Sequence, residues 1–189
     1  AWVEILKENY PDDELIPELD KDVKRLQLIA ERFSKIGSLP EPVSASMNDV
    51  LEHVITYIDR RTSDKVAIHR RFPDYDITVK MNASLFEWVI ENLCKNSADA
   101  MNGKGDITIS ITEEKNKVFI DITDTGKGIP PKMQKRIFSP GYTSKSRGWG
   151  LGLTLAKRII QNYHRGKLFV KSSVIDQGTT MRIQLNSGK

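Results

Sequence analysis

The feature that most constrains the fold is a double alternation of apolar and polar side chains between residues 107 and 123. In the first stretch Ile107, Ile109 and Ile111 alternate with Thr and Ser, and in the second Val118, Ile120 and Ile122 alternate with Phe119, Asp121 and Thr123. A side-chain period of two indicates a β-strand, because successive side chains leave opposite faces. The sequence therefore predicts two strands that pair as a hairpin.

The segments around this hairpin predict a mixed α/β domain. Apolar residues at helical spacing predict helices over 47–58, 83–101 and 151–163. Short strands are expected at 66–72, 77–80, 168–172 and 180–185. The polar, glycine-rich stretch 124–148 is too long for an ordinary connection, so we expect it to be a functional lid.

The N-terminal part predicts a separate helical unit. Apolar residues at helical spacing end at residue 9, and a second helical pattern runs from Pro17 to Ile36, so residues 1–37 are expected to form a helical hairpin. Prolines and serines collect in residues 38–46, which are expected to be a linker before one domain over 47–189. Because the apolar pattern is already running at Trp2, we expect the sequence to be a fragment of a longer protein.

Composition excludes several classes of protein. The 189 residues hold 29 Lys and Arg against 25 Asp and Glu, a mild excess that permits phosphate-bearing partners without indicating nucleic acid. One cysteine, Cys94, excludes internal disulfides and a multi-cysteine metal site. No window approaches the roughly 18 apolar residues of a membrane span. We expect a soluble, cytoplasmic domain, either free or the cytoplasmic part of a membrane-anchored protein.

The predicted helix over 83–101 carries polar side chains on its apolar side. At 100° per residue, Asn92, Asn96 and Asp99 continue the stripe of Leu85 and Val89. The opposite side carries a second polar stripe, of Glu87, Glu91 and Lys95. Two amides and a carboxylate are therefore expected to face inward, where they belong either to a satisfied internal network or to a ligand site.

Two glycine motifs suggest a ligand. In the first, residues 124–129, the glycines allow close backbone approach to a planar ligand and Asp124 can accept a hydrogen bond from an exocyclic amine, although an ordinary turn has the same sequence. In the second, Gly148, Gly150 and Gly152 open a helix, where unshielded N–H groups favour phosphate. The alternative is a flexible hinge without a ligand. Neither a Rossmann fingerprint nor a P-loop is present.

In order along the chain, these stretches resemble the N, G1, F, G2 and G3 boxes of the ATP-binding domain shared by sensor histidine kinases, gyrase-type ATPases, Hsp90 chaperones and mismatch-repair ATPases. The matching stretches are residues 92–100, 124–129, 137–145, 148–153 and 178–180. The resemblance implies a Bergerat-type fold, a two-layer α/β sandwich with a mixed sheet and helices on one face, preceded by a truncated helical hairpin.

The resemblance also implies a site for ATP and Mg²⁺. Asn96 would bind Mg²⁺ with Asn92 beside it, Asp124 would read the adenine amino group, and Gly126, Gly128, Ile129 and Thr179 would surround the base. The remaining residues of the predicted site would bind the phosphates or belong to the lid. They are Tyr142, Thr143, Ser144, Lys145, Arg147, Gly148, Trp149, Gly150, Leu151, Gly152 and Leu153. Tyr142 and Trp149 would either cover the nucleotide or pack the closed lid. Asp99 would order water near the metal or bond within the core.

Two features distinguish the branches of this family. The gyrase, Hsp90 and mismatch-repair branches place a general-base glutamate where this chain has Asn92, and an amide cannot act as a base, so rapid hydrolysis is disfavoured. Residues 29–37 resemble the end of the dimerisation and phosphotransfer hairpin of sensor histidine kinases. The resemblance therefore implies a protein histidine kinase whose intact form is a homodimer and passes phosphate to a histidine and then to a response-regulator receiver domain.

None of the three histidines in this sequence is expected to accept the phosphoryl group. None of His53, His69 and His164 lies in the phosphoacceptor motif, so no catalytic residue is assigned and the fragment is expected not to phosphorylate itself. His53 and His69 are expected on the surface, and His164 as a cation near a helix C-terminus. Two alternatives stay open: a chaperone- or mismatch-repair-like ATPase that has lost its base, and a binding module in which ATP only orders the lid.

Overall fold

The computed structural model describes residues 42–59, 62, 65–143 and 150–188. The chain divides into two compact units, residues 1–40 and 41–189. The helical hairpin predicted over 1–37 lies outside the described residues. Within those residues no helix is long and apolar enough to cross a lipid bilayer.

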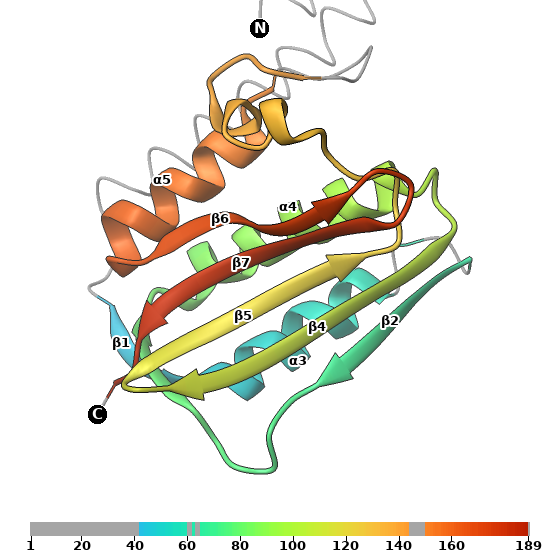
Figure 1. Ribbon diagram of the computed structural model, residues 1–189. Coiled ribbons are helices and arrows are strands. Elements are labelled where there is room, and N and C mark those ends of the chain that lie inside the picture. Colours follow the sequence, from blue (N-terminus) through green and yellow to red (C-terminus); the bar gives the residue numbers. More distant parts are fainter. Residues whose placement is uncertain (1–41, 60–61, 63–64, 144–149, 189) are drawn as a thin grey trace, which may run out of the picture. The chain divides into compact units, whose positions relative to one another are not determined.

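The second unit is built on a five-stranded mixed sheet (Figure 1). Its spatial order is β2 (Val66–Arg71), β4 (Gly105–Glu114), β5 (Lys117–Asp124), β7 (Gly178–Asn186) and β6 (Lys167–Val174). The pair β2 and β4 is parallel and the other pairs are antiparallel. The predicted hairpin is confirmed, because Ile109 pairs with Ile122 across β4 and β5.

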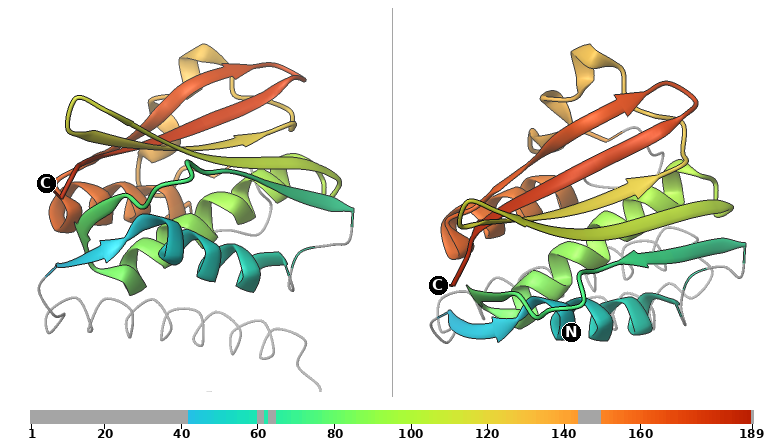
Figure 2. Two further views of the ribbon diagram at one scale, coloured as in Figure 1. Left: turned by 90° about the horizontal axis from the view of Figure 1, so that it is seen from below. Right: turned by 60° about the horizontal axis from the view of Figure 1, so that its bottom comes forward.

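Three helices cover one face of the sheet, as Figure 2 shows in side view: α3 (Met47–Asp59), α4 (Ala83–Ala100) and α5 (Gly152–His164). The alternating apolar side chains point toward these helices, and Ile107, Ile109, Ile120 and Ile122 are fully buried. The fold is thus the two-layer α/β sandwich that the sequence predicted.

The strand β1 (Val43–Ser46) corrects the predicted linker, which extended to residue 46. It pairs antiparallel with β3 (Thr78–Met81) in a separate two-stranded sheet, with Val43 opposite Met81. The prolines and serines of this stretch carry no local strand signal. Its extended conformation is instead selected by a partner far along the chain.

The start of α4 meets the end of α5 at His164, which lies at a helix C-terminus as predicted, but the prediction that it is a cation there is wrong. Asn82 caps α4 by accepting the N–H of Leu85 at 3.1 Å, and its own N–H donates to Nε2 of His164 at 3.3 Å. The Nδ1–H of His164 donates to the carbonyl of Ile159 at 3.2 Å, and the Phe86 ring contacts the imidazole edge-on. Burial lowers the pKa of His164, so the ring is neutral and acts as both donor and acceptor.

The first part of the predicted lid is packed onto α5. It forms two 3-10 turns, η2 (Pro131–Met133) and η3 (Arg136–Phe138), and Ile137 and Phe138 are buried. The carbonyl of Phe138 accepts the hydroxyl of Thr154 at 3.0 Å, and the ammonium of Lys157 lies 4.7 Å from the Phe138 ring centre. Because of these contacts, the stretch up to Phe138 belongs to the packed domain. The predicted lid, residues 124–148, therefore begins too early in the chain.

Candidate functional site

Asp124 is a buried carboxylate at the end of β5, with 4% of its surface exposed. Its Oδ1 accepts two backbone N–H groups, from Gly126 at 2.9 Å and from Thr179 at 3.2 Å. Its Oδ2 accepts the hydroxyl of Ser97 at 3.1 Å. A carboxylate offers about four acceptor positions. These three donors therefore leave one position on Oδ2 for a further donor.

The electrostatics of Asp124 differ from those of an ordinary buried ion pair. Burial raises its pKa, and the hydrogen bonds from Gly126, Ser97 and Thr179 only partly oppose that rise. No charged side chain of the described residues contributes to the shift. A buried carboxylate held by neutral donors, without a cation, is typical of functional sites.

The loop after β5 fits tightly between two other parts of the fold. A Cβ atom on Gly126 would lie 2.9 Å from the backbone of Ala100, whose carbonyl accepts the N–H of Lys127 at 3.1 Å. Gly128 has φ +71° and packs against the carbonyl of Val174. Both glycines are therefore required by packing within the protein, and this loop is held rigidly beside Asp124.

Thr179 reaches the site from β7. The register places it opposite Asp124, and it is 5% exposed. Its hydroxyl lies 2.8 Å from that of Ser173, which in turn accepts the N–H of Ile129 at 2.7 Å. The structure thus brings together Asp124, Ile129 and Thr179, which the sequence analysis placed around one base.

The start of α5 contacts the middle of α4. A Cβ atom on Gly152 would lie 2.7 Å from Oδ1 and 3.0 Å from Nδ2 of Asn92, so only glycine fits there. The Nδ2 atom of Asn92 is buried without a hydrogen-bond partner. The residue before α5, Leu151, makes no side-chain capping hydrogen bond, so within the described part of the chain its side chain leaves the first N–H groups of this helix uncapped. An unpartnered amide and an uncapped helix N-terminus face the same place.

The other polar residues of α4 agree only in part with the helical wheel. Asn96 is half-buried one turn after Asn92, as expected, but Asp99 is exposed. The prediction that Asp99 faces inward is wrong, because this residue lies in the last turn of α4, where a side chain reaches solvent around the helix end. In the opposite stripe Lys95 is exposed, whereas Glu87 and Glu91 are half-buried.

The donor set suits a hard cation. Rotation of the Asn92 amide would bring its oxygen to the position of the unpartnered Nδ2, and Asn96 offers a second amide oxygen. Mg²⁺ takes one or two protein oxygens together with water and phosphate oxygens. Within the described residues no three His, Cys, Asp or Glu side chains gather closely enough to hold a metal. The asparagines therefore fit Mg²⁺ bound mainly through a phosphate ligand.

The remaining predicted residues flank the second glycine motif. Gly150 has φ +63° and packs against the carbonyl of Tyr142. Tyr142 is half-buried and its ring centre lies 5.6 Å from the guanidinium of Arg136, a contact within this part of the chain. Leu151 and Leu153 are half-buried and Thr143 is exposed. Ser144, Lys145, Arg147, Gly148 and Trp149 lie outside the described residues.

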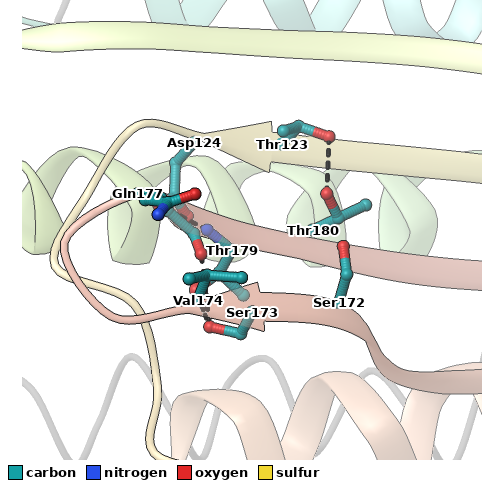
Figure 3. Close-up of a pocket in the computed structure, with 9 residues that line it drawn as sticks. Thr123, Asp124, Ser172, Ser173, Val174, Gln177, Thr179 and Thr180 are labelled. Atoms are coloured by element: carbon teal, nitrogen blue, oxygen red, sulfur yellow. Dashed lines mark hydrogen bonds between the residues drawn. The ribbon is translucent and has the colours of Figure 1, made fainter.

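A polar cavity of about 160 Å³ adjoins Asp124 and Thr179. Figure 3 shows that it spans the ends of β5, β6 and β7, and the hydroxyls of Thr123 and Thr180 meet beside it at 3.0 Å. Pockets for drug-sized ligands and cofactors usually exceed about 300 Å³. This cavity therefore does not hold a whole nucleotide.

The sequence analysis missed two residues that complete the site, Ser97 and Ser173. Each contributes a hydroxyl to the network around Asp124 and Thr179. No local pattern marks either serine, because their partners are distant in sequence. The one hint in the sequence is that Ser97 directly follows Asn96, and the structure shows that Ser97 is buried.

Comparison with known families gives a match over most of this unit. The sequence profile of the family described as "Histidine kinase-, DNA gyrase B-, and HSP90-like ATPase" matches residues 81–189. Among characterised relatives, Sporulation kinase C of Bacillus subtilis is 26% identical over 98% of this chain and 44% of its own length. Sporulation kinase B of the same organism is 36% identical over 87% of this chain and 36% of its own length. The chain therefore spans less than half of each kinase.

Solved structures show the same fold. The catalytic domain of histidine kinase ThkA superposes with a TM-score of 0.70 at 24% identity, covering 78% of this chain and 96% of that domain. The histidine kinase domain of the E. coli osmosensor EnvZ gives a TM-score of 0.60 at 29% identity, covering 78% of this chain and 90% of that one. A structure of ThkA in complex with response regulator protein TrrA gives a TM-score of 0.72 at 20% identity, covering 98% of this chain and 55% of that one.

Proposed function

Because the chain belongs to the histidine kinase-, DNA gyrase B- and HSP90-like ATPase family, we propose that it is the ATP-binding catalytic domain of a sensor histidine kinase. The sporulation kinases named above are relatives in sequence, and the catalytic domain of ThkA shares its two-layer fold. In the intact protein this domain would hold ATP while the γ-phosphoryl group passes to a histidine.

The observation that carries the proposal is the open acceptor position on Asp124. A buried carboxylate with one unfilled acceptor position suits the exocyclic amino group of adenine. Thr179 donates to the other oxygen of Asp124, and Ile129 donates to Ser173 in the same network, so the base would contact one hydroxyl and one aliphatic side chain. The open acceptor position of Asp124 thus complements a ligand that donates a hydrogen bond from an amino group.

The triphosphate end of the site is proposed around Asn92, Asn96 and the start of α5. Bound Mg²⁺ would supply positive charge that neutralises the phosphates, and the two asparagines would hold it through their amide oxygens. The N–H groups that open α5 would donate to the phosphate oxygens. Lys145 and Arg147 are proposed to add mobile positive charge to this end.

Phosphotransfer is favoured over hydrolysis by the identity of residue 92. An amide cannot abstract a proton from water, and the neighbouring Glu91 is on another side of the helix, about 100° away. We therefore propose that the acceptor is a histidine on a dimerising helical hairpin and that the final partner is a receiver domain. The ThkA complex with TrrA gives that partner a precedent in a related fold. This arrangement would operate in the cytoplasm.

The proposal is tested by calorimetric titration of Mg-ATP into the parent chain, Asp124→Asn and the control Asp106→Asn. Asp106 is exposed and lies at the start of β4. We expect the Asp124 variant to lose about 10- to 100-fold in affinity, since a charged acceptor is replaced by an amide, and Asp106→Asn to bind like the parent. Circular dichroism verifies folding. Failure of the folded parent to bind, or equal losses in both variants, contradicts the assignment.

A further inference from the structure

We propose that Ser97 is a specificity-determining residue, because its hydroxyl fixes the Asp124 carboxylate as an acceptor and so selects a base with an amino group over one with a carbonyl. The inference rests on the proposed function and concerns the same site. Ser97 lies on α4 and is 3% exposed, so its hydroxyl is shielded from water and must bond within the protein.

The three donors to Asp124 come from three parts of the fold. Gly126 belongs to the loop after β5, Thr179 to β7 and Ser97 to α4. The first two donate through backbone N–H groups to the same oxygen, Oδ1. Among the residues that the structure describes, Ser97 is the one that donates through a side chain and the one whose hydrogen bond reaches Oδ2. It is therefore the one donor that a substitution can remove without altering the backbone.

The Ser97 hydrogen bond decides what Oδ2 offers to a ligand. With this donor in place, Oδ2 has one acceptor position left and no proton of its own to donate. An amino group at position 6 of a purine can fill that position. A carbonyl oxygen there cannot, because two acceptors would face each other in a buried site.

Removing the hydroxyl would weaken that discrimination. Oδ2 would then lack any protein donor, although burial already penalises the charged form of Asp124. Once protonated, the carboxyl could donate to a carbonyl oxygen. Asp121 on the same strand differs, because Lys171 and Arg182 hold it as an anion.

The first experiment compares the binding of Mg-ATP and Mg-ITP, which differ at position 6 in carrying an amino group or a carbonyl. Calorimetry on the parent should show a clear preference for ATP. In Ser97→Ala we expect this preference to fall about tenfold, in line with one buried hydrogen bond. Ser97→Thr keeps a hydroxyl and should restore the preference. If Ser97→Ala weakens both nucleotides equally, the serine only packs and the inference is overturned.

A second experiment does not need a nucleotide. The side-chain carboxyl of Asp124 is titrated by ¹³C NMR in the parent, in Ser97→Ala and in Ser97→Cys, which has a similar size and a weaker donor. We expect the pKa of Asp124 to rise in both variants, and most in Ser97→Ala, because a hydrogen bond to the charged form is lost. An unchanged pKa overturns the role of Ser97. If the parent binds neither nucleotide, the proposed function fails, whereas this titration still tests the serine.

Discussion

Gly152 and Asn92 are in such close contact that a Cβ atom on the glycine would lie 2.7 Å from the amide oxygen of the asparagine. Alanine is normally up to about 1 kcal/mol more favourable than glycine within a helix. Here we expect Gly152→Ala to destabilise the domain by about 1–2 kcal/mol, because the added methyl displaces Asn92.

Urea unfolding of a double-mutant cycle checks this prediction. In an Asn92→Ala background the clash is absent, so Gly152→Ala should become neutral or stabilising. An equal effect of Gly152→Ala in both backgrounds would show that the two residues are not coupled.

Asp121 should control stability in acid. Burial alone would raise its pKa, but hydrogen bonds and charge from Arg182 and Lys171 outweigh that effect and lower the pKa. The unfolded state then binds more protons than the folded state, so this stabilisation is complete above the ordinary pKa of about 3.9 and is lost as the pH falls through the lower folded value. Asp121→Asn should unfold at less denaturant at pH 7 and lose less stability between pH 4 and pH 2. Asp106→Asn is the exposed control, and an unchanged acid profile in Asp121→Asn would refute the expectation.

His164 should make stability depend on pH in a higher range. Burial lowers its pKa, so below about pH 6.5 the unfolded state binds more protons than the folded state. Stability from this residue is therefore complete above that pH and falls as the pH decreases. Urea unfolding at pH 5.0 and 7.5 should show the loss, and His164→Gln should reduce it. An unchanged pH dependence in His164→Gln would contradict the expectation.

Cys94 should be unreactive in the folded protein. Burial raises the pKa of its thiol to about 12, and 1% of the residue is exposed. The thiolate is the reactive form, so a chromogenic disulfide reagent at pH 8 should label the native chain very slowly. The same reagent in urea should label one thiol per chain, because the sequence has a single cysteine. Fast labelling without urea would contradict the buried position.

Elements with a local repeat could be predicted from the sequence. The alternation in β4 and β5 and the helical spacing in α4 each report on the geometry of neighbouring residues, and the structure has both elements. Elements decided by a distant partner could not be predicted. The strand β1 exists through its pairing with β3, and His164 is buried through a bond to Asn82.

The candidate site also contains residues that the sequence could predict and residues that it could not. Asp124 and Asn92 lie in recognisable motifs, and the structure places them beside Thr179 and Gly152. The resemblance predicted that Asp124 and Thr179 surround the same base, and no spacing in the sequence indicates that they come together. Ser97 was missed because its hydrogen-bond partner Asp124 belongs to another element. The assignments of Ser144, Lys145, Arg147, Gly148 and Trp149 stay predictions.

The contact of Gly150 with the carbonyl of Tyr142 has a consequence for the entropy of folding. Because Tyr142 and Gly150 are in contact, these two anchors do not limit the length of chain that connects them. Doubling the length of a flexible loop costs only about 0.6 kcal/mol in closure entropy. A longer connection between these two residues would therefore add little to the entropic cost of folding the sheet and the helices.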